Sequence, residues 1–170
     1  MNTKQNSRFL IVEDDPDQMR LLTSLALAEI KSLVHENAEN DVQRQILSNL
    51  QIVKVSNISS LKKAVSSYKE IFFVLLDCNI PDTKDSAAHD QLLKTDYRIT
   101  GQHKSVDIIT ENLPGVPITM VSSLNRFQKI VGRYYKNTFD LRVNFIRKND
   151  QAAISKNIRD QLVRFIGRAV

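Results

Sequence analysis

Five short and almost continuously apolar segments recur along the chain, and each is followed by polar residues and then by a helical pattern. The segments are residues 8–12, 51–55, 71–76, 116–121 and 142–146. A strand that is apolar on both of its faces is typical of a parallel sheet covered by helices on both sides. This alternation therefore predicts an α/β protein in which strands and helices follow one another in a (βα)5 order.

The segments between the strands carry apolar residues at helical spacing. Helices are expected at about residues 16–34, 41–50, 59–69, 102–112 and 126–135. A last helix is expected on the stripe Ile154, Ile158, Leu162, Phe165 and Ile166. Asp15 followed by Pro16 is a typical helix start. By the same criterion, we expect Asp41 to cap the second helix and Ser59 or Ser60 to cap the third. The predicted architecture is a three-layer, doubly wound parallel sheet.

The length and composition indicate one globular domain over residues 8–170. The chain has 170 residues, 42% of them hydrophobic and 25% charged, which suits a single core and does not fit a disordered chain. Its longest apolar run, residues 71–76, is far shorter than the roughly 20 residues that a membrane-spanning helix needs, so no membrane association is expected. One cysteine, Cys78, and the lack of a secretory signal predict a reducing, cytoplasmic location.

Basic residues are concentrated toward the C-terminus. From Arg126 onward eleven Lys and Arg side chains oppose three Asp, a net charge of +8, so the first 125 residues carry −3. Such a distribution suits either ordinary solvated helix faces or an acidic partner bound through residues such as Arg126, Lys129 and Arg133. No basic run is interleaved with aromatic residues, so nucleic acid is not the expected partner.

Polar residues follow the predicted strands at the points where these strands end. Glu13 and Asp14 follow the first strand, Asp77 the third, Ser122 the fourth and Lys148 the fifth. The carboxyl ends of parallel strands meet at one edge of the sheet, where ligands of such folds bind. Clustered carboxylates need a cation, and oxygen ligands of this kind suit Mg²⁺ or Mn²⁺. Because a lysine and a hydroxyl suit phosphate oxygens, the sequence predicts a divalent metal and a phosphoryl group here.

Four segments of the chain resemble motifs of the receiver domains of two-component response regulators. FLIVEDDPD resembles the first strand with its acidic pair, and VLLDCNIPD resembles the segment that carries the phosphorylated aspartate. PITMVSS resembles the fourth strand, and VNFIRKND resembles the segment with the lysine and the switch aromatic. The resemblance covers about residues 8–169 and implies a flavodoxin-like fold with strand order 2-1-3-4-5.

The resemblance implies a phosphorylation site and a metal site. Asp77 would accept a phosphoryl group from a histidine kinase or a histidine phosphotransfer protein, and Lys148 would pair with Asp77 or with its phosphoryl group. Asp14, Asp77 and the backbone carbonyl of Asn79 would ligate Mg²⁺ (or Mn²⁺), with Glu13 acting through water.

The resemblance also implies a two-state switch in a phosphorelay. Ser122 would move toward the phosphoryl group and let Phe145 turn inward, reshaping the face built from the family's fourth helix, fifth strand and fifth helix. A protein of this kind signals to a downstream protein target, which the sequence does not name. It is no enzyme beyond catalysing its own phosphorylation and dephosphorylation.

The chain departs from a minimal receiver in two insertions. About 16 extra residues fall near 34–50, and nineteen residues, 82–100, follow the turn after Asp77 where the family has only a few. The second insertion is either a neutral loop or an element that covers or gates Asp77. Asn149 stands where a proline is common, and the chain ends at its last helix, so a stand-alone receiver without an output domain is expected.

Two other functions fit parts of the pattern. A phosphorylation-independent adaptor would keep the receiver fold, but it has no need of all five polar groups at the sheet edge. A phosphohydrolase with an aspartyl nucleophile typically needs a second aspartate two residues after the first, and Asn79 occupies that position. The phosphorylatable receiver is therefore the preferred interpretation, with the adaptor as its alternative.

Overall fold

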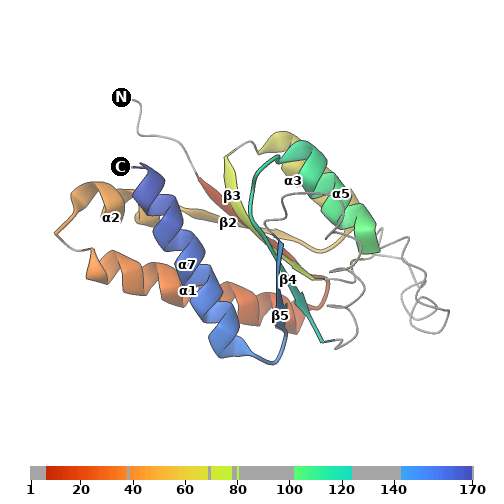
Figure 1. The fold of residues 1–170 in the computed structure, drawn as a ribbon, viewed down its shortest axis with the longest axis horizontal. Coiled ribbons are helices and arrows are strands. Elements are labelled where there is room, and N and C mark those ends of the chain that lie inside the picture. Colours follow the sequence, from red (N-terminus) through yellow and green to blue (C-terminus); the bar gives the residue numbers. More distant parts are fainter. Residues whose placement is uncertain are drawn as a thin grey trace.

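The computed structural model describes residues 7–37, 39–68, 70–77, 80, 102–123 and 143–169 (Figure 1). The strands in this part of the chain are β1 (Arg8–Val12), β2 (Gln51–Val55), β3 (Ile71–Asp77), β4 (Ile118–Ser122) and β5 (Val143–Arg147). The helices are α1 (Pro16–Glu36), α2 (Asp41–Ser48), α3 (Ile58–Ser67), α5 (Gln102–Asn112) and α7 (Gln151–Ala169). Among these helices, none has the length and apolar character needed to cross a membrane.

Several predictions from the sequence fall outside the described residues. These are the helix at 126–135 with Arg126, Lys129 and Arg133, the insertion at 82–100, and the residues Cys78 and Asn79. The remaining predicted strands and helices all form, with ends within a few residues of those expected.

The strands form one parallel sheet in the order β2-β1-β3-β4-β5. The first strand lies inside the sheet, and the chain moves outward from it to β2 on one side and through β3 and β4 to β5 on the other. The change of direction between β1 and β3 is the place where such sheets bind ligands. The predicted α/β, flavodoxin-like fold is confirmed.

Successive strand side chains point to opposite faces of the sheet and build two cores. In β1, Leu10 and Val12 pack with residues of α3 and α5, whereas Phe9 and Ile11 pack with residues of α1, α2 and α7. Figure 1 shows the same two groups of helices on the two sides of the sheet. Because both faces are covered, a central strand must be apolar at every position, which explains the uninterrupted run at 71–76.

The start of α1 follows the predicted pattern. The Asp15 carboxylate accepts hydrogen bonds from the backbone N–H groups of Asp17 (2.8 Å) and Gln18 (3.2 Å), and Pro16 occupies the first helical position. These amides hold the pKa of Asp15 below its usual value. The cap anchors α1 immediately after the acidic residues that leave β1.

The predicted caps of the next two helices are wrong. Asn40, not Asp41, caps α2, and its side-chain oxygen accepts from the Gln43 amide at 3.1 Å. Asn57, not Ser59 or Ser60, caps α3. A cap residue must have extended backbone, and the chain turns into each helix one to three residues earlier than the sequence indicated.

The first insertion is part of the folded core. The end of α1 and the whole of α2 lie within residues 34–50, and Leu47 of α2 is buried in the core shared by α1 and α7. Ile46 and Leu50 are partly buried against the same core. The extra residues therefore add a helix to the α1–α7 side of the sheet.

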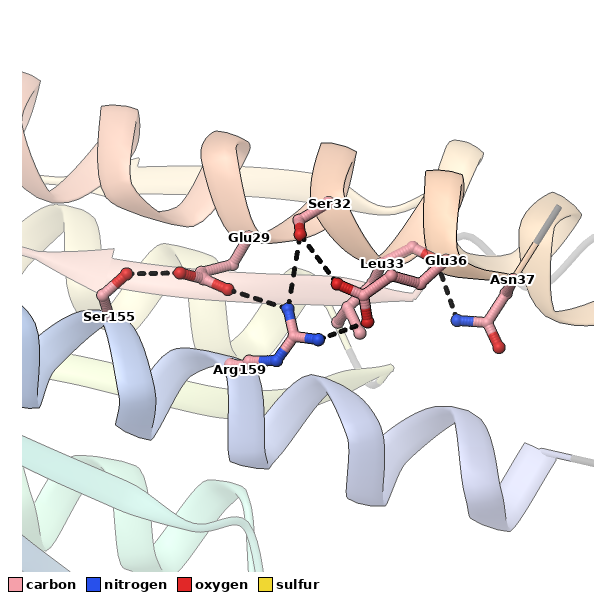
Figure 2. A network of polar contacts seen from close by, with 7 residues as sticks. All are labelled: Glu29, Ser32, Leu33, Glu36, Asn37, Ser155 and Arg159. Carbon is pink, nitrogen blue, oxygen red and sulfur yellow. Dashed lines mark hydrogen bonds and ion pairs between the residues drawn. The ribbon is translucent and has the colours of Figure 1, made fainter.

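A polar network joins α1 to α7 beside this core (Figure 2). The guanidinium of Arg159 contacts Glu29 at 3.3 Å and also pairs with Glu36, while Ser155 donates to Glu29. The hydrogen bonds from Arg159 and Ser32 lower the pKa of Glu36. Arg159 of α7 thus forms ion pairs with two glutamates that lie about two turns apart on α1.

Candidate functional site

Five of the residues predicted for the site lie at the carboxyl ends of four strands. Glu13 and Asp14 follow β1, Asp77 is the last residue of β3, Ser122 is the last residue of β4, and Lys148 follows β5. Backbone hydrogen bonds hold these exits in place: the Glu13 N–H donates to the Val55 carbonyl at 2.9 Å, and the Lys148 N–H donates to the Ser122 carbonyl at 3.0 Å. The sheet therefore sets the relative positions of the polar residues.

Lys148 joins two carboxylates at this edge. Its Nζ lies 3.0 Å from Asp77 Oδ2 and 2.9 Å from Glu13 Oε2, and it donates a hydrogen bond to Glu13 Oε1 at 3.1 Å. The Glu13 side chain is fully buried, and only 8% of the Asp77 side chain is exposed. The sequence predicted the contact with Asp77 but not the contact with Glu13, although three acidic residues and one lysine at the same edge were a signal for it.

The three carboxylates crowd one another. Oxygen atoms of Glu13, Asp14 and Asp77 all lie within 4.8 Å of one another. Burial raises the pKa of Glu13, the negative charge of Asp77 raises it further, and the value reaches about 7 despite the opposing effect of Lys148. Glu13 is therefore a carboxylate whose ionised form is disfavoured in the absence of a further positive charge.

The same charges act on the lysine in the opposite direction. Burial alone would lower the pKa of Lys148, but the carboxylates of Asp77 and Glu13 outweigh this effect and raise it. The ammonium therefore stays charged, and it neutralises only one of three negative charges when all the carboxylates are ionised. The residual charge leaves this edge suited to a cation.

The donor set fits a small divalent cation. Glu13 Oε2 is buried and makes no hydrogen bond of ordinary geometry, although Lys148 is within ion-pair distance. Asp14 is half-buried at the same edge, which keeps its side of the cluster accessible to solvent. Carboxylate oxygens with an open side are the ligands of Mg²⁺ or Mn²⁺ in proteins. Glu13, Asp14 and Asp77 would hold such an ion here.

Three further residues predicted for the site, besides the carboxylates and Lys148, are Ser122, Phe145 and Asn79. Ser122 is half-buried at the end of β4, beside the backbone of Lys148. Phe145, in β5, is half-buried and packs against the core under α3 and α5. Asn79, the predicted carbonyl ligand, lies outside the described residues.

Comparisons of the sequence find no relative, since no family model and no curated protein matches. Solved structures do match. The receiver domain of the sensor histidine kinase PA1611 from Pseudomonas aeruginosa, with magnesium coordinated in its active-site cleft, has a TM-score of 0.56 at 12% identity. That match covers 92% of this chain and 98% of that one.

Two further receivers are similar over most of the chain. A response regulator receiver protein from Sinorhizobium medicae has a TM-score of 0.55 at 12% identity, covering 94% of this chain and 96% of that one. The Mn²⁺-bound response regulator Rcp1 has a TM-score of 0.51 at 12% identity, covering 94% of each chain. The chain therefore has the receiver fold, and the resemblance seen in the sequence is confirmed for the fold.

Proposed function

We propose that this chain, which has the receiver fold, is a phosphorylatable receiver of a two-component or phosphorelay system. The main support for this proposal is the contact of Lys148 Nζ with both Asp77 and Glu13 inside a carboxylate cluster. The positive charge of Lys148 beside Asp77 suits a carboxylate that receives a negatively charged phosphoryl group, and the cluster is open to solvent on the side of Asp14. The donor would be the phosphohistidine of a histidine kinase or a histidine phosphotransfer protein.

The proposed reaction transfers a phosphoryl group between two side chains. An oxygen of Asp77 attacks the phosphorus, the P–N bond to the donor histidine breaks, and its electron pair stays on the imidazole nitrogen. The product is an acyl phosphate on Asp77, and its later attack by water returns the carboxylate and inorganic phosphate. The protein would thus catalyse only its own phosphorylation and dephosphorylation.

Each neighbouring residue has a role that follows from its position. Lys148, already 3.0 Å from Asp77, neutralises negative charge on the incoming phosphoryl oxygens. A Mg²⁺ or Mn²⁺ ion held by Glu13, Asp14 and Asp77, with the Asn79 carbonyl as a further ligand, would shield the charge of the phosphoryl group. The metal-bound receivers of Pseudomonas and Rcp1 support this assignment.

The proposed switch lies in β4 and β5. The Ser122 hydroxyl would donate to the acyl phosphate, and its movement would allow Phe145 to turn inward from its half-buried position. Because the Lys148 N–H is bonded to the Ser122 carbonyl, a shift at Ser122 also acts on the end of β5. The changed face would then bind a downstream protein in the cytoplasm, where a single thiol stays reduced.

Phosphorylation at Asp77 tests the proposal directly. The protein is incubated with Mg²⁺ and acetyl phosphate, and the phosphorylated residue is identified by mass spectrometry after borohydride trapping. NMR spectra with beryllofluoride report the conformational change. We expect both responses in the wild type and in the surface control Asp107→Asn, and neither in Asp77→Asn.

Two results would contradict the proposal. Equal responses in the wild type and Asp77→Asn would place the reaction elsewhere. No response in the wild type, with Mg²⁺ bound, would favour a phosphorylation-independent adaptor that keeps the fold for protein interaction alone.

A further inference from the structure

A pocket of about 550 Å³ lies between α7 and the beginnings of β4 and β5. Ile118 and Val143, the first residues of these two strands, form part of its wall. Asp77 and Ser122 end their strands, so the pocket lies at the opposite end of the sheet from the proposed phosphorylation site. Its volume is in the range of small-molecule sites in proteins.

The sheet contributes an aromatic side chain, Phe72, to the wall of this pocket. The pairing of β1 with β3 is irregular at Phe72, with Arg8 opposite Ile71 and Phe9 opposite Phe73. This irregularity lets Phe72 contact the α7 side of the sheet together with its neighbour Phe73. Phe72 stacks on Phe165 of α7, with ring centroids 4.1 Å apart, and both half-buried rings line the pocket.

The side-chain carbonyl oxygens of two asparagines in the lining each accept a hydrogen bond from the protein. The buried Thr119 hydroxyl donates to Asn157 Oδ1 at 2.7 Å, and the Phe145 backbone N–H donates to Asn144 Oδ1 at 2.9 Å. These bonds orient both side-chain amides, and among the described residues neither NH₂ group donates a hydrogen bond. Two NH₂ groups, each with two N–H donors, are thus present at the pocket wall.

A stripe of α7 adds positive charge. Asn157, Gln161, Arg164 and Arg168 follow one another at helical spacing and all line the pocket. The side chains of Arg164 and Arg168 form no ion pair or hydrogen bond with the described residues, whereas Arg159 on another face of α7 is paired with Glu29 and Glu36. The described lining contains one carboxylate, Asp160, against these two guanidinium groups.

We propose that this pocket binds a small anionic molecule that carries a flat apolar group. The guanidinium groups of Arg164 and Arg168 and the amides of Asn144 and Asn157 bind the carboxylate or phosphate. The Phe72–Phe165 pair contacts the apolar part. This site is separate from Asp77 and needs neither phosphorylation nor a metal.

Phenyl phosphate and benzoate are suitable probes, with phenol and inorganic phosphate as their neutral and purely ionic counterparts. Binding is followed by backbone amide NMR shifts at constant ionic strength and without Mg²⁺, so that the Asp77 edge does not contribute a metal site. We expect shifts at residues 117–119, 143–145 and along α7 from Asn157 to Arg168. The dissociation constant should be about a millimolar or lower for ligands of this size.

Matched variants separate the pocket from general surface charge. Arg164→Gln/Arg168→Gln should weaken binding of phenyl phosphate by about tenfold or more, because charge-assisted hydrogen bonds are lost. Asn157→Asp keeps the acceptor for Thr119 but repels the anion, and it should weaken binding as well. Lys156→Gln removes a positive charge from α7 outside the pocket and should leave the affinity within about twofold.

The relative affinities of the probes identify the anionic group that the pocket prefers. Stronger binding of benzoate than of phenyl phosphate identifies a carboxylate ligand, and the reverse identifies a phosphate ligand. Binding of phenol as tight as that of both anions, no shifts at the named residues, or equal weakening by Lys156→Gln and the double variant would each overturn the proposal. A response of Asp77 to acetyl phosphate has no bearing on these measurements.

Discussion

Lys148 Nζ lies 3.0 Å from Asp77 Oδ2, although β4 separates β5 from β3 in the sheet. The lysine side chain crosses the end of β4 to reach Asp77, and it also contacts Glu13 at the end of β1. One ammonium thereby connects the exits of three strands. It therefore opposes the negative charge of an edge that carries three carboxylates.

Replacing Lys148 by methionine should destabilise the metal-free protein at pH 8. Two almost fully buried carboxylates would lose their counter-ion, which costs about 3 kcal/mol in the free energy of unfolding. Urea unfolding measures the change, and Lys156→Met on the exposed side of α7 is the control. A loss no larger than that of the control would show that the ammonium contributes little.

The ionisation of Glu13 should make stability depend on pH. Its folded pKa of about 7 lies above the ordinary value of 4.5, so the folded protein holds this proton more tightly than the unfolded chain. Protonation of Glu13 therefore contributes its full share to the free energy of unfolding below pH 4.5. This contribution is lost as the pH rises through 7. Glu13→Gln imitates the protonated form, and its stability relative to the wild type should therefore rise across this range, by up to about 3 kcal/mol.

Chemical denaturation at a series of pH values between 4 and 8 checks this prediction. The exposed residue Glu111 offers a matched control, since Glu111→Gln should show no such trend over the same range. A difference between wild type and Glu13→Gln that stays constant with pH would contradict the assignment.

Divalent cations should stabilise the protein through the same carboxylates. Mg²⁺ at ten times its dissociation constant should add about 1.4 kcal/mol to the free energy of unfolding. The effect should be larger at pH 8 than at pH 6, because at pH 6 the cation must displace the proton of Glu13. Asp14→Asn should reduce it strongly, and Asp107→Asn should not.

Thermal unfolding with MgCl₂, compared with NaCl of equal ionic strength, measures this stabilisation. Equal effects of the two salts would mean that the cluster does not bind a divalent ion specifically.

The Arg159 network should hold the last turns of α1 against α7. Arg159→Met removes the contacts with Glu29 and Glu36, and we expect only a small loss in the free energy of unfolding because water screens these largely exposed ion pairs. Hydrogen exchange should increase mainly between Glu29 and Asn37. The contribution of the Glu36 pair should disappear as the pH falls below the ordinary glutamate value, since Arg159 lowers the pKa of Glu36. An unchanged exchange rate in this segment would contradict the role of the network.

The candidate site illustrates what the sequence could and could not predict. Glu13, Asp14, Asp77, Ser122 and Lys148 were identifiable because each follows or ends an apolar strand, and parallel strands place their ends together. The helix caps at Asn40 and Asn57 were missed, because neighbouring Asp and Ser residues are equally good caps. Only the exact turn of the backbone out of the preceding segment selects between them.

The order of apolar and polar residues alone determined the α/β class, the strands, and the set of polar residues at the sheet edge. These properties are local, since they depend on which side chains must avoid water. The tertiary structure alone decided that Lys148 is shared by Asp77 and Glu13, and that burial raises the pKa of Glu13. It also decided that the irregular pairing at Phe72 brings two aromatic rings to a donor-rich pocket. Distances, burial and strand register depend on how distant segments pack together, and no local pattern encodes them.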